Sequence, residues 1–196
     1  MYLTQPLKTY LDDLAARKST PGGGSAAALA GASAAALVSM VCNFTLGKEK
    51  YQAHEAEIKS ILAQSEAMRA ELERLIDKDV EAYNQIAQAG REVNDTILKQ
   101  AESIPEQVCK HCLDGSKLCA ALVDIGNRNL ISDVGVAAEF FLSAFLAARL
   151  NVEINLKFIK DKKFSAIISS HLKSAEKQIQ TLNQKIGVKV GKAIRG

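Results

Sequence analysis

The 196-residue sequence has no tryptophan, only three prolines and an aromatic content of 5%. It also lacks any run of alternating apolar and polar residues long enough for a β-strand, which argues against a sheet. Neither an internal repeat nor a linker of distinct composition divides it. Because 47% of its residues are hydrophobic, the chain can bury a sizeable core. We therefore predict a single all-α domain that spans residues 1–196.

Strong charge and a secretion signal are also missing. The net charge is +3, whereas a nucleic-acid-binding surface needs clustered basic residues, so no nucleic acid partner is expected. The N-terminus has neither the basic nor the apolar segment of a secretory leader. The four cysteines are therefore expected to be reduced thiols in a cytoplasmic protein.

One stretch, residues 19–47, carries no charge at all, and its length is sufficient to cross a membrane. Much of it is alanine, which contributes little to membrane insertion, and its glycines and Asn43 oppose insertion. We therefore predict a central helix of a soluble bundle, whose small residues let neighbouring backbones approach closely. No membrane partner is expected.

Apolar periodicity predicts an up-and-down bundle of about six helices. The expected helices span residues 3–14, 25–46, 51–86, 94–125, 132–160 and 164–186. Pro105 should kink or interrupt the fourth helix, because a proline inside a helix removes a backbone hydrogen bond. Residues 188–196 are expected to form a frayed tail.

The fifth predicted helix is apolar on every side. Between Val134 and Leu150 only Glu139 and Arg149 are charged. A helix of this kind is buried all round, yet six helices from one small chain do not easily enclose it. We therefore predict a homodimer in which this helix, or its neighbour over residues 25–46, packs against a second subunit.

The third predicted helix contains a carboxylate at a position where its apolar stripe predicts a core residue. The stripe runs from Ile58 to Ile86 in steps of three and four, and Asp79 occupies one of its places, whereas Asp77 and Glu81 lie off it. Burial of an unpaired carboxylate is costly or raises its pKa. Asp79 is therefore either a structural ion pair or helix cap, or a group that transfers protons in a cleft.

The glycine-rich segment from Pro21 to Ser25 (PGGGS) precedes the second predicted helix. Ser25 is a suitable N-cap, and the glycines allow a ligand to approach the amides at the positive end of the helix. The segment lacks the Gly-Lys-Ser/Thr of a P-loop. It is either a binding site for an anionic or polar group, or a flexible corner that permits close packing.

Polar residues at the start of the fifth predicted helix form another candidate site. Asp133 lies in the first predicted turn, and Asn127 and Asn129 lie in the connection before it. They could bind a planar heterocycle, or they could serve only as helix-start and turn residues. Asn151 and Asn155 share the helix face of Asp133, but Asn151 would lie about 27 Å from it along the axis.

Three cysteines, Cys109, Cys112 and Cys119, fall on one predicted helix face, with His111 nearby. A single C-x-x-C pair on a helix is a weak indication of a metal site. Buried thiols that act as small apolar side chains are commoner. We therefore predict no metal.

Several separated motifs resemble the formimidoyltetrahydrofolate cyclodeaminase / methenyltetrahydrofolate cyclohydrolase family. They are PGGGSAAALAGASAAALVSMVCNFTLGKEKY from Pro21, DKDVEAY from Asp77, GNRNLISDVGV from Gly126 and NVEIN from Asn151. The resemblance extends from about residue 3 to residue 160. In one respect the chain differs: members of the family carry a longer stretch rich in Pro, Lys and Glu where this chain has residues 88–96 (QAGREVNDT).

This resemblance implies a folate one-carbon enzyme, either a cyclohydrolase or a cyclodeaminase, which binds a reduced folate and uses no cofactor. It assigns residues to three roles: Asp79 and Asp133 as catalytic carboxylates, Asn127 and Asn129 as pterin contacts, and Gly23, Gly24 and Ser25 as amide donors to the folate. The competing hypothesis is a non-catalytic helical dimer that binds folate or a protein partner.

Overall fold

The computed structural model describes all of residues 1–196 and contains helices but no strand. The six α-helices are α1 (Leu7–Ala15), α2 (Gly23–Thr45), α3 (Glu55–Ala89), α4 (Asp95–Ile125), α5 (Ile131–Phe158) and α6 (Lys162–Arg195). Short 3-10 helices occupy Glu49–His54, Gly90–Glu92 and Arg128–Leu130. The predictions of an all-α fold and of about six helices are confirmed.

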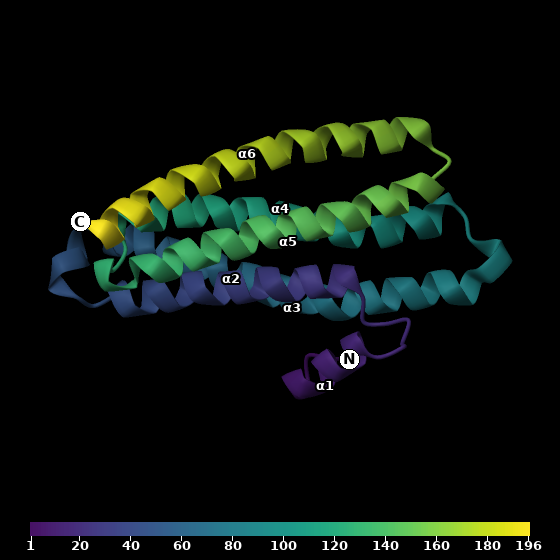
Figure 1. Ribbon diagram of the computed structural model, residues 1–196, viewed down its shortest axis with the longest axis horizontal. Helices are drawn as coiled ribbons and strands as arrows, with labels where there is room; N and C mark the ends of the chain where they lie inside the picture. The colour runs from purple at the N-terminus through teal and green to yellow at the C-terminus, as the bar shows by residue number, and fades with distance from the viewer.

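The four helices α2 to α5 form the bundle, and α6 packs along α4 and α5 (Figure 1). With 23 residues, α2 is shorter than α3, α4 and α5, which have 35, 31 and 28 residues. It begins part-way along the bundle, so α3, α4 and α5 extend beyond its N-terminus (Figure 1). We call the end of the bundle that α2 does not reach the open end.

Small residues on α2 allow close helix packing, as the sequence predicted. Ala28, Ala34 and Ala35 are completely buried. A Cβ atom at Gly31 would lie 3.2 Å from a methyl group of Leu72 on α3 and 3.3 Å from Cys112 Sγ on α4. The glycine therefore brings the α2 backbone close to both neighbouring helices.

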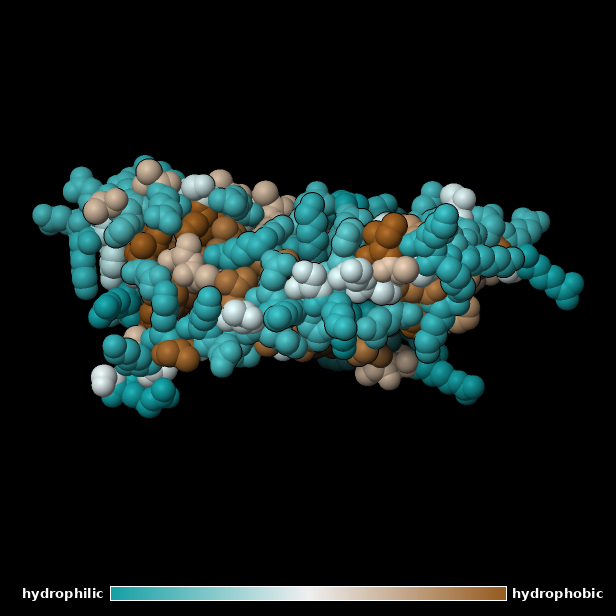
Figure 2. Space-filling model, turned by 90° about the horizontal axis from the view of Figure 1, so that it is seen from above, coloured by the Kyte–Doolittle hydropathy of each residue, from teal (hydrophilic) through white to brown (hydrophobic).

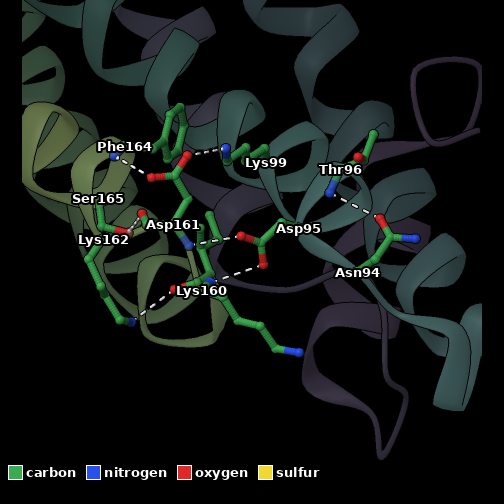
Figure 3. Close-up of polar contacts among 10 residues, drawn as sticks. Asn94, Asp95, Thr96, Lys99, Lys160, Asp161, Lys162, Phe164 and Ser165 are labelled. Carbon is green, nitrogen blue, oxygen red and sulfur yellow. Dashed lines mark hydrogen bonds and ion pairs between the residues drawn. The ribbon is translucent and has the colours of Figure 1, made fainter.

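At the open end of the bundle, the first turns of α4 are bound to the connection between α5 and α6 (Figure 3). The Asp95 carboxylate accepts hydrogen bonds from the backbone N–H of Lys160 at 2.9 Å and of Asp161 at 2.8 Å. Asp161 in turn accepts from the Phe164 N–H at 3.0 Å and from Lys99 Nζ at 2.8 Å. These contacts fix the start of α4 relative to the end of α5.

The predicted interruption of the fourth helix at Pro105 and the predicted end of the last helix near Ile186 are both wrong. Helix α4 continues through Pro105 without a break, because a single missing hydrogen bond is tolerated in a helix that is packed along its whole length. The last helix does not end near Ile186 with a frayed tail but continues to Arg195. Its last turns are held because Val190 is buried and Lys189 pairs with Asp124 at 2.5 Å.

The N-terminal helix α1 lies outside the bundle (Figure 1). Its leucines do not pack into the core: Leu7 is 61% exposed and Leu11 50%, and only Tyr10 is buried. Two contacts hold this region. The Tyr10 hydroxyl donates to Ser25 Oγ at 3.2 Å, and the Tyr2 N–H donates to the Asp77 carboxylate at 2.5 Å.

By length and hydropathy alone, α2 and the stretch Arg128–Phe158 could each cross a membrane. Core helices of a bundle meet the same criterion, and 61% of the most apolar window of α2 is buried against other helices. The corresponding share for the Arg128–Phe158 stretch is 33%. Seen from above, the molecular surface is largely hydrophilic, with separate hydrophobic patches between polar side chains (Figure 2).

Candidate functional site

Asp79 lies on α3 beside the first turn of α2, and its Oδ2 accepts a hydrogen bond from the Ser25 N–H at 2.9 Å. The N-cap of α2 is Gly22 and the helix begins at Gly23, so the prediction that Ser25 is the N-cap is wrong. Instead, a carboxylate from a neighbouring helix satisfies one of the free amides of the first turn. Asp79 therefore does act as a helix cap, and it forms no ion pair with a lysine, arginine or histidine.

Gly24 makes this contact possible. A Cβ atom at position 24 would lie 2.7 Å from Cγ and 3.0 Å from Oδ2 of Asp79, which is closer than a side chain can approach. Glycine is therefore required here because any side chain would collide with the carboxylate, and not because the backbone has an unusual φ angle. By contrast, a Cβ atom at Gly22 would meet nothing within 4 Å.

A cavity of about 250 Å³ opens where α2 begins, and we call it the Asp79 cavity. Its walls come from the α2 start with the preceding loop, from α3, from Ala101 on α4 and from α5. On α3 it is lined by Asp79, Tyr83 and Ile86, the last three places of the predicted stripe. The earlier places pack against α2, whereas Asp79 lies beside the first turn of α2. Tyr83 and Ile86 follow one and two helical turns further along α3, so this part of the stripe faces a cavity instead of a core.

The environment of Asp79 alters its acidity. Burial raises the pKa of the Asp79 carboxyl above its usual value, and the hydrogen bond from the Ser25 N–H opposes part of this rise. A carboxylate with a raised pKa can both accept and return a proton closer to neutral pH than an ordinary aspartate.

Two backbone amides beside Asp79 are free to bind a ligand. The first helix-type hydrogen bond of α2 runs from the Ala26 N–H to the Gly22 carbonyl at 3.0 Å, and the Ser25 N–H donates to Asp79. The amides of Gly23 and Gly24 therefore have no acceptor within the protein. Of the three predicted backbone donors, Gly23 and Gly24 are available, whereas Ser25 is already occupied.

The other predicted site residues lie at the opposite end of the bundle. The Asn127 N–H donates to Thr45 Oγ1 at 3.0 Å, and Thr45 is the last residue of α2, whereas Gly23 is the first. Since α2 has 23 residues, the two ends are separated by about 33 Å. Within one chain, Asn127, Asn129 and Asp133 therefore cannot contact the same pterin ring as Asp79.

The Asn127 side chain forms hydrogen bonds that connect two helices at that end of the bundle. Its Nδ2 donates to the Phe44 carbonyl at 3.1 Å and its Oδ1 accepts from the Asn129 N–H at 3.1 Å. These bonds join the end of α2 to the start of α5, which agrees with the alternative of turn chemistry. Asn129 is exposed, and Asp133 is partly buried in the first turn of α5. The catalytic role of Asp133 and the pterin contact of Asn129 stay predictions.

Residues 6–174 match the model of the formiminotransferase-cyclodeaminase family. The chain belongs to this family. A methenyltetrahydrofolate cyclohydrolase of Methylorubrum extorquens is 37% identical over 195 residues, covering 93% of this chain and 94% of that protein. A formimidoyltransferase-cyclodeaminase of Sus scrofa is 29% identical over 192 residues, and this chain spans 36% of its length.

A solved structure of the family has the same fold. The crystal structure of formiminotetrahydrofolate cyclodeaminase from Thermotoga maritima superimposes with a TM-score of 0.95 at 34% identity, covering 99% of this chain and 100% of that one. The family resemblance inferred from the glycine-rich, acidic and Asn-containing motifs is thus confirmed.

The structure differs from the sequence predictions in the burial of one carboxylate and in several residues that line the cavity. Asp77, expected off the core stripe, is 3% exposed, and it binds the Tyr2 N–H of the N-terminal segment. Tyr83, Asn151 and Asn155 line the Asp79 cavity but were not assigned to the site. The sequence shows that the two asparagines lie one helical turn apart. It does not show where α2 begins relative to α5, and this position decides that they line the cavity together with Asp79.

The cysteines pack as buried thiols in the family fold. Burial raises the pKa of Cys109 and of Cys119 to about 12 in each case. Cys109 Sγ lies 3.6 Å from the Phe145 carbonyl oxygen of α5. Cys112 is completely buried at the contact with Gly31 of α2. These side chains fill helix interfaces around α4.

Proposed function

We propose that the protein acts on the carbon–nitrogen bonds of the one-carbon bridge of a reduced folate, as a methenyltetrahydrofolate cyclohydrolase or a formimidoyltetrahydrofolate cyclodeaminase. The observation that carries the proposal is the Asp79 carboxylate, which has a raised pKa and lies in a cavity beside the free amides of Gly23 and Gly24. Membership of a family whose relatives are named for these two activities supports it.

In the cyclohydrolase reaction, water attacks the cationic methenyl carbon between N5 and N10. Ionised Asp79 accepts a proton from this water as the C–O bond forms, and it returns the proton to N5 as the C–N5 bond breaks. The remaining hydroxyl proton is released to solvent as the formyl C=O forms. The product is 10-formyltetrahydrofolate. A negative charge at Asp79 also stabilises the cationic bridge.

In the cyclodeaminase reaction, N10 attacks the carbon of the 5-formimidoyl group. Asp79 accepts the N10 proton and passes it to the imine nitrogen, which becomes an amino group on the tetrahedral carbon. A second proton, taken from solvent through the same carboxyl group, leaves with this nitrogen as ammonia, and the methenyl bridge closes. Both reactions move protons without a change of oxidation state, so we propose that no resident cofactor is required.

The methenyl chromophore provides a direct test with purified protein. Loss of its absorbance from 5,10-methenyltetrahydrofolate reports cyclohydrolase activity, and its appearance from 5-formimidoyltetrahydrofolate reports cyclodeaminase activity. The two assays therefore separate the two reactions. The non-catalytic alternative, a helical dimer that only binds folate, predicts calorimetric binding of tetrahydrofolate with no change of absorbance in either assay, and that result would contradict the proposal.

Asp79→Asn tests the catalytic assignment. The variant retains the shape of the side chain and an oxygen that accepts from the Ser25 N–H, but it cannot exchange a proton. Turnover should fall by about 10²- to 10⁴-fold, with the far-ultraviolet circular dichroism unchanged. Glu81→Gln serves as the matched control and should retain full activity. Glu81 lies two residues after Asp79 on α3, and its only ion pair is with Lys78 at 2.6 Å. Full activity in Asp79→Asn would remove Asp79 from the mechanism.

We also propose that the protein is a homodimer. Helix α5 leaves apolar side chains exposed on one side, although its neighbours α2, α4 and α6 cover the other. The exposed large apolar residues of α5 are Val136, Phe140, Leu150, Ile154 and Phe158. An exposed apolar surface of this kind favours contact with a second subunit.

A further inference from the structure

Two asparagines of α5 line the Asp79 cavity one helical turn apart. Asn151 Nδ2 donates to the Ala147 carbonyl of its own helix at 3.0 Å, which fixes the amide plane and leaves its Oδ1 without a donor. Asn155 makes no side-chain hydrogen bond with the protein. Both side chains are partly buried, and both belong to the lining of the cavity. Each therefore has a free carbonyl oxygen in the lining of the cavity that also contains the candidate catalytic carboxylate.

The polar groups along this wall follow a defined order. Gly24 contacts Asp79, and a Cβ atom at the neighbouring Gly23 would lie 3.6 Å from Nδ2 and 3.7 Å from Oδ1 of Asn151. Asn155 follows about one turn, or roughly 6 Å, further from α2. The sequence of groups is thus a carboxylate, then a free amide donor, then two free carbonyl acceptors.

A pterin presents the complementary order. Its O4 accepts hydrogen bonds, its N3–H donates, and its 2-amino group donates. O4 is separated from N5, which carries the one-carbon bridge, by only two ring carbons. A pterin whose bridge carbon lies at Asp79 therefore has O4 near the α2 amides, followed by its two donors in a row. Burying a donor without an acceptor costs free energy, so matched acceptors determine selectivity.

We propose that Asn151 and Asn155 are the specificity-determining residues for the pterin ring. The Oδ1 of Asn151 accepts from N3–H and the Oδ1 of Asn155 accepts from the 2-amino group, while the Gly23 amide donates to O4. This inference rests on the proposed function, because it takes the pterin as the ligand of the Asp79 cavity.

The test compares the natural methenyl substrate with an analogue in which a methyl group replaces the 2-amino group. The wild-type protein should prefer the natural substrate by about 10- to 100-fold in kcat/KM, since one hydrogen bond is lost. Asn155→Leu should abolish this preference, chiefly through KM. Asn155→Asp retains an acceptor and should restore it, which a merely structural role would not explain. Glu153→Gln, exposed on the same helix, is the control and should keep the wild-type ratio.

Failure of this inference can be distinguished from failure of the proposed function. Turnover of the natural substrate without preference over the analogue, or a preference that persists in Asn155→Leu, overturns the assignment of Asn155 and leaves the reaction intact. If neither substrate is turned over, the ratio of calorimetric Kd values for tetrahydrofolate and its 2-methyl analogue gives the same comparison without catalysis. Equal Kd values in the wild-type protein would overturn the inference.

Discussion

At the scale of single residues, the contact between Gly24 and Asp79 joins the backbone of α2 to the proposed catalytic carboxylate. Gly24→Ala would place a methyl group 2.7 Å from Asp79 Cγ, so the carboxylate must move. We expect turnover to fall by about tenfold or more, since displacement of a reacting group by about 1 Å can cost 10²-fold. The loss in unfolding free energy should be about 1–3 kcal/mol.

Gly22→Ala is the matched control for Gly24→Ala, because its Cβ atom would meet nothing within 4 Å and its φ of −127° suits alanine. Steady-state kinetics and urea unfolding of both variants provide the comparison. Equal kinetics in Gly24→Ala and Gly22→Ala would show that the position of the carboxylate does not depend on the glycine.

A second carboxyl group, Glu102 on α4, determines a pH dependence of stability. Its side chain is completely buried and neither oxygen has a hydrogen-bond partner. Burial, and secondarily the charge of Glu106, raise the pKa of Glu102 from 4.5 to about 7. The folded state therefore keeps the proton over a range in which the unfolded state releases it. The stability contributed by this group is complete below pH 4.5 and is lost as the pH rises to about 7.

Glu102→Gln removes this titration and keeps the shape of the side chain. Relative to the variant, the unfolding free energy of the wild-type protein should fall by roughly 3 kcal/mol between pH 4 and pH 8. Urea unfolding at both pH values measures the difference. Parallel stability profiles for the two proteins would show that Glu102 titrates normally.

At the scale of helices, the C-terminal part of α6 contributes to packing. Val190 is 9% exposed and faces Gly135 of α5, whereas Val188, two residues earlier, is 67% exposed. Val190→Ala should therefore reduce the unfolding free energy by about 1–2 kcal/mol. Val188→Ala should change it by less than about 0.5 kcal/mol. Equal effects in chemical unfolding would mean that this part of α6 is not packed in solution.

Periodicity identified the helices because a buried face repeats every three to four residues, as along α3 from Ile58 to Leu75. Helix ends and interruptions were harder to predict, since tertiary packing decides them. Packing against α5 carries α6 past the predicted end at Ile186, and packing along α4 outweighs the hydrogen bond lost at Pro105. Local sequence carries little information on such long-range contacts.

The site was only partly predictable for a related reason. Asp79 was found because a carboxylate interrupts an apolar stripe, and the glycines because they precede a helix. Asn155 was missed because its place in the cavity depends on where α2 begins relative to α5. Asp77 was misjudged because the Tyr2 N–H, which is 75 residues away in the chain, supplies its partner.

At the scale of the whole molecule, the exposed apolar side of α5 leads to a prediction about assembly. The wild-type protein should sediment as a dimer at micromolar concentration. Phe140 is 42% exposed on α5, and Phe140→Glu should shift the protein to the monomer by placing a charge in the contact. Ile167→Glu, at a 55% exposed position of α6, is the control and should leave the dimer intact. A wild-type monomer of ordinary thermal stability would contradict the prediction.

The start of α2 also sets the size of the proposed binding site. Because the helix start forms the end wall of the Asp79 cavity, each residue added in front of Gly23 in helical conformation would move that wall by about 1.5 Å. Shortening α2 from its start would enlarge the cavity by the same steps, while the hydrogen bonds between Asp95 and the α5–α6 connection keep the start of α4 fixed relative to the end of α5. Under the proposed function, the length of α2 therefore determines how much space the one-carbon group has beside Asp79.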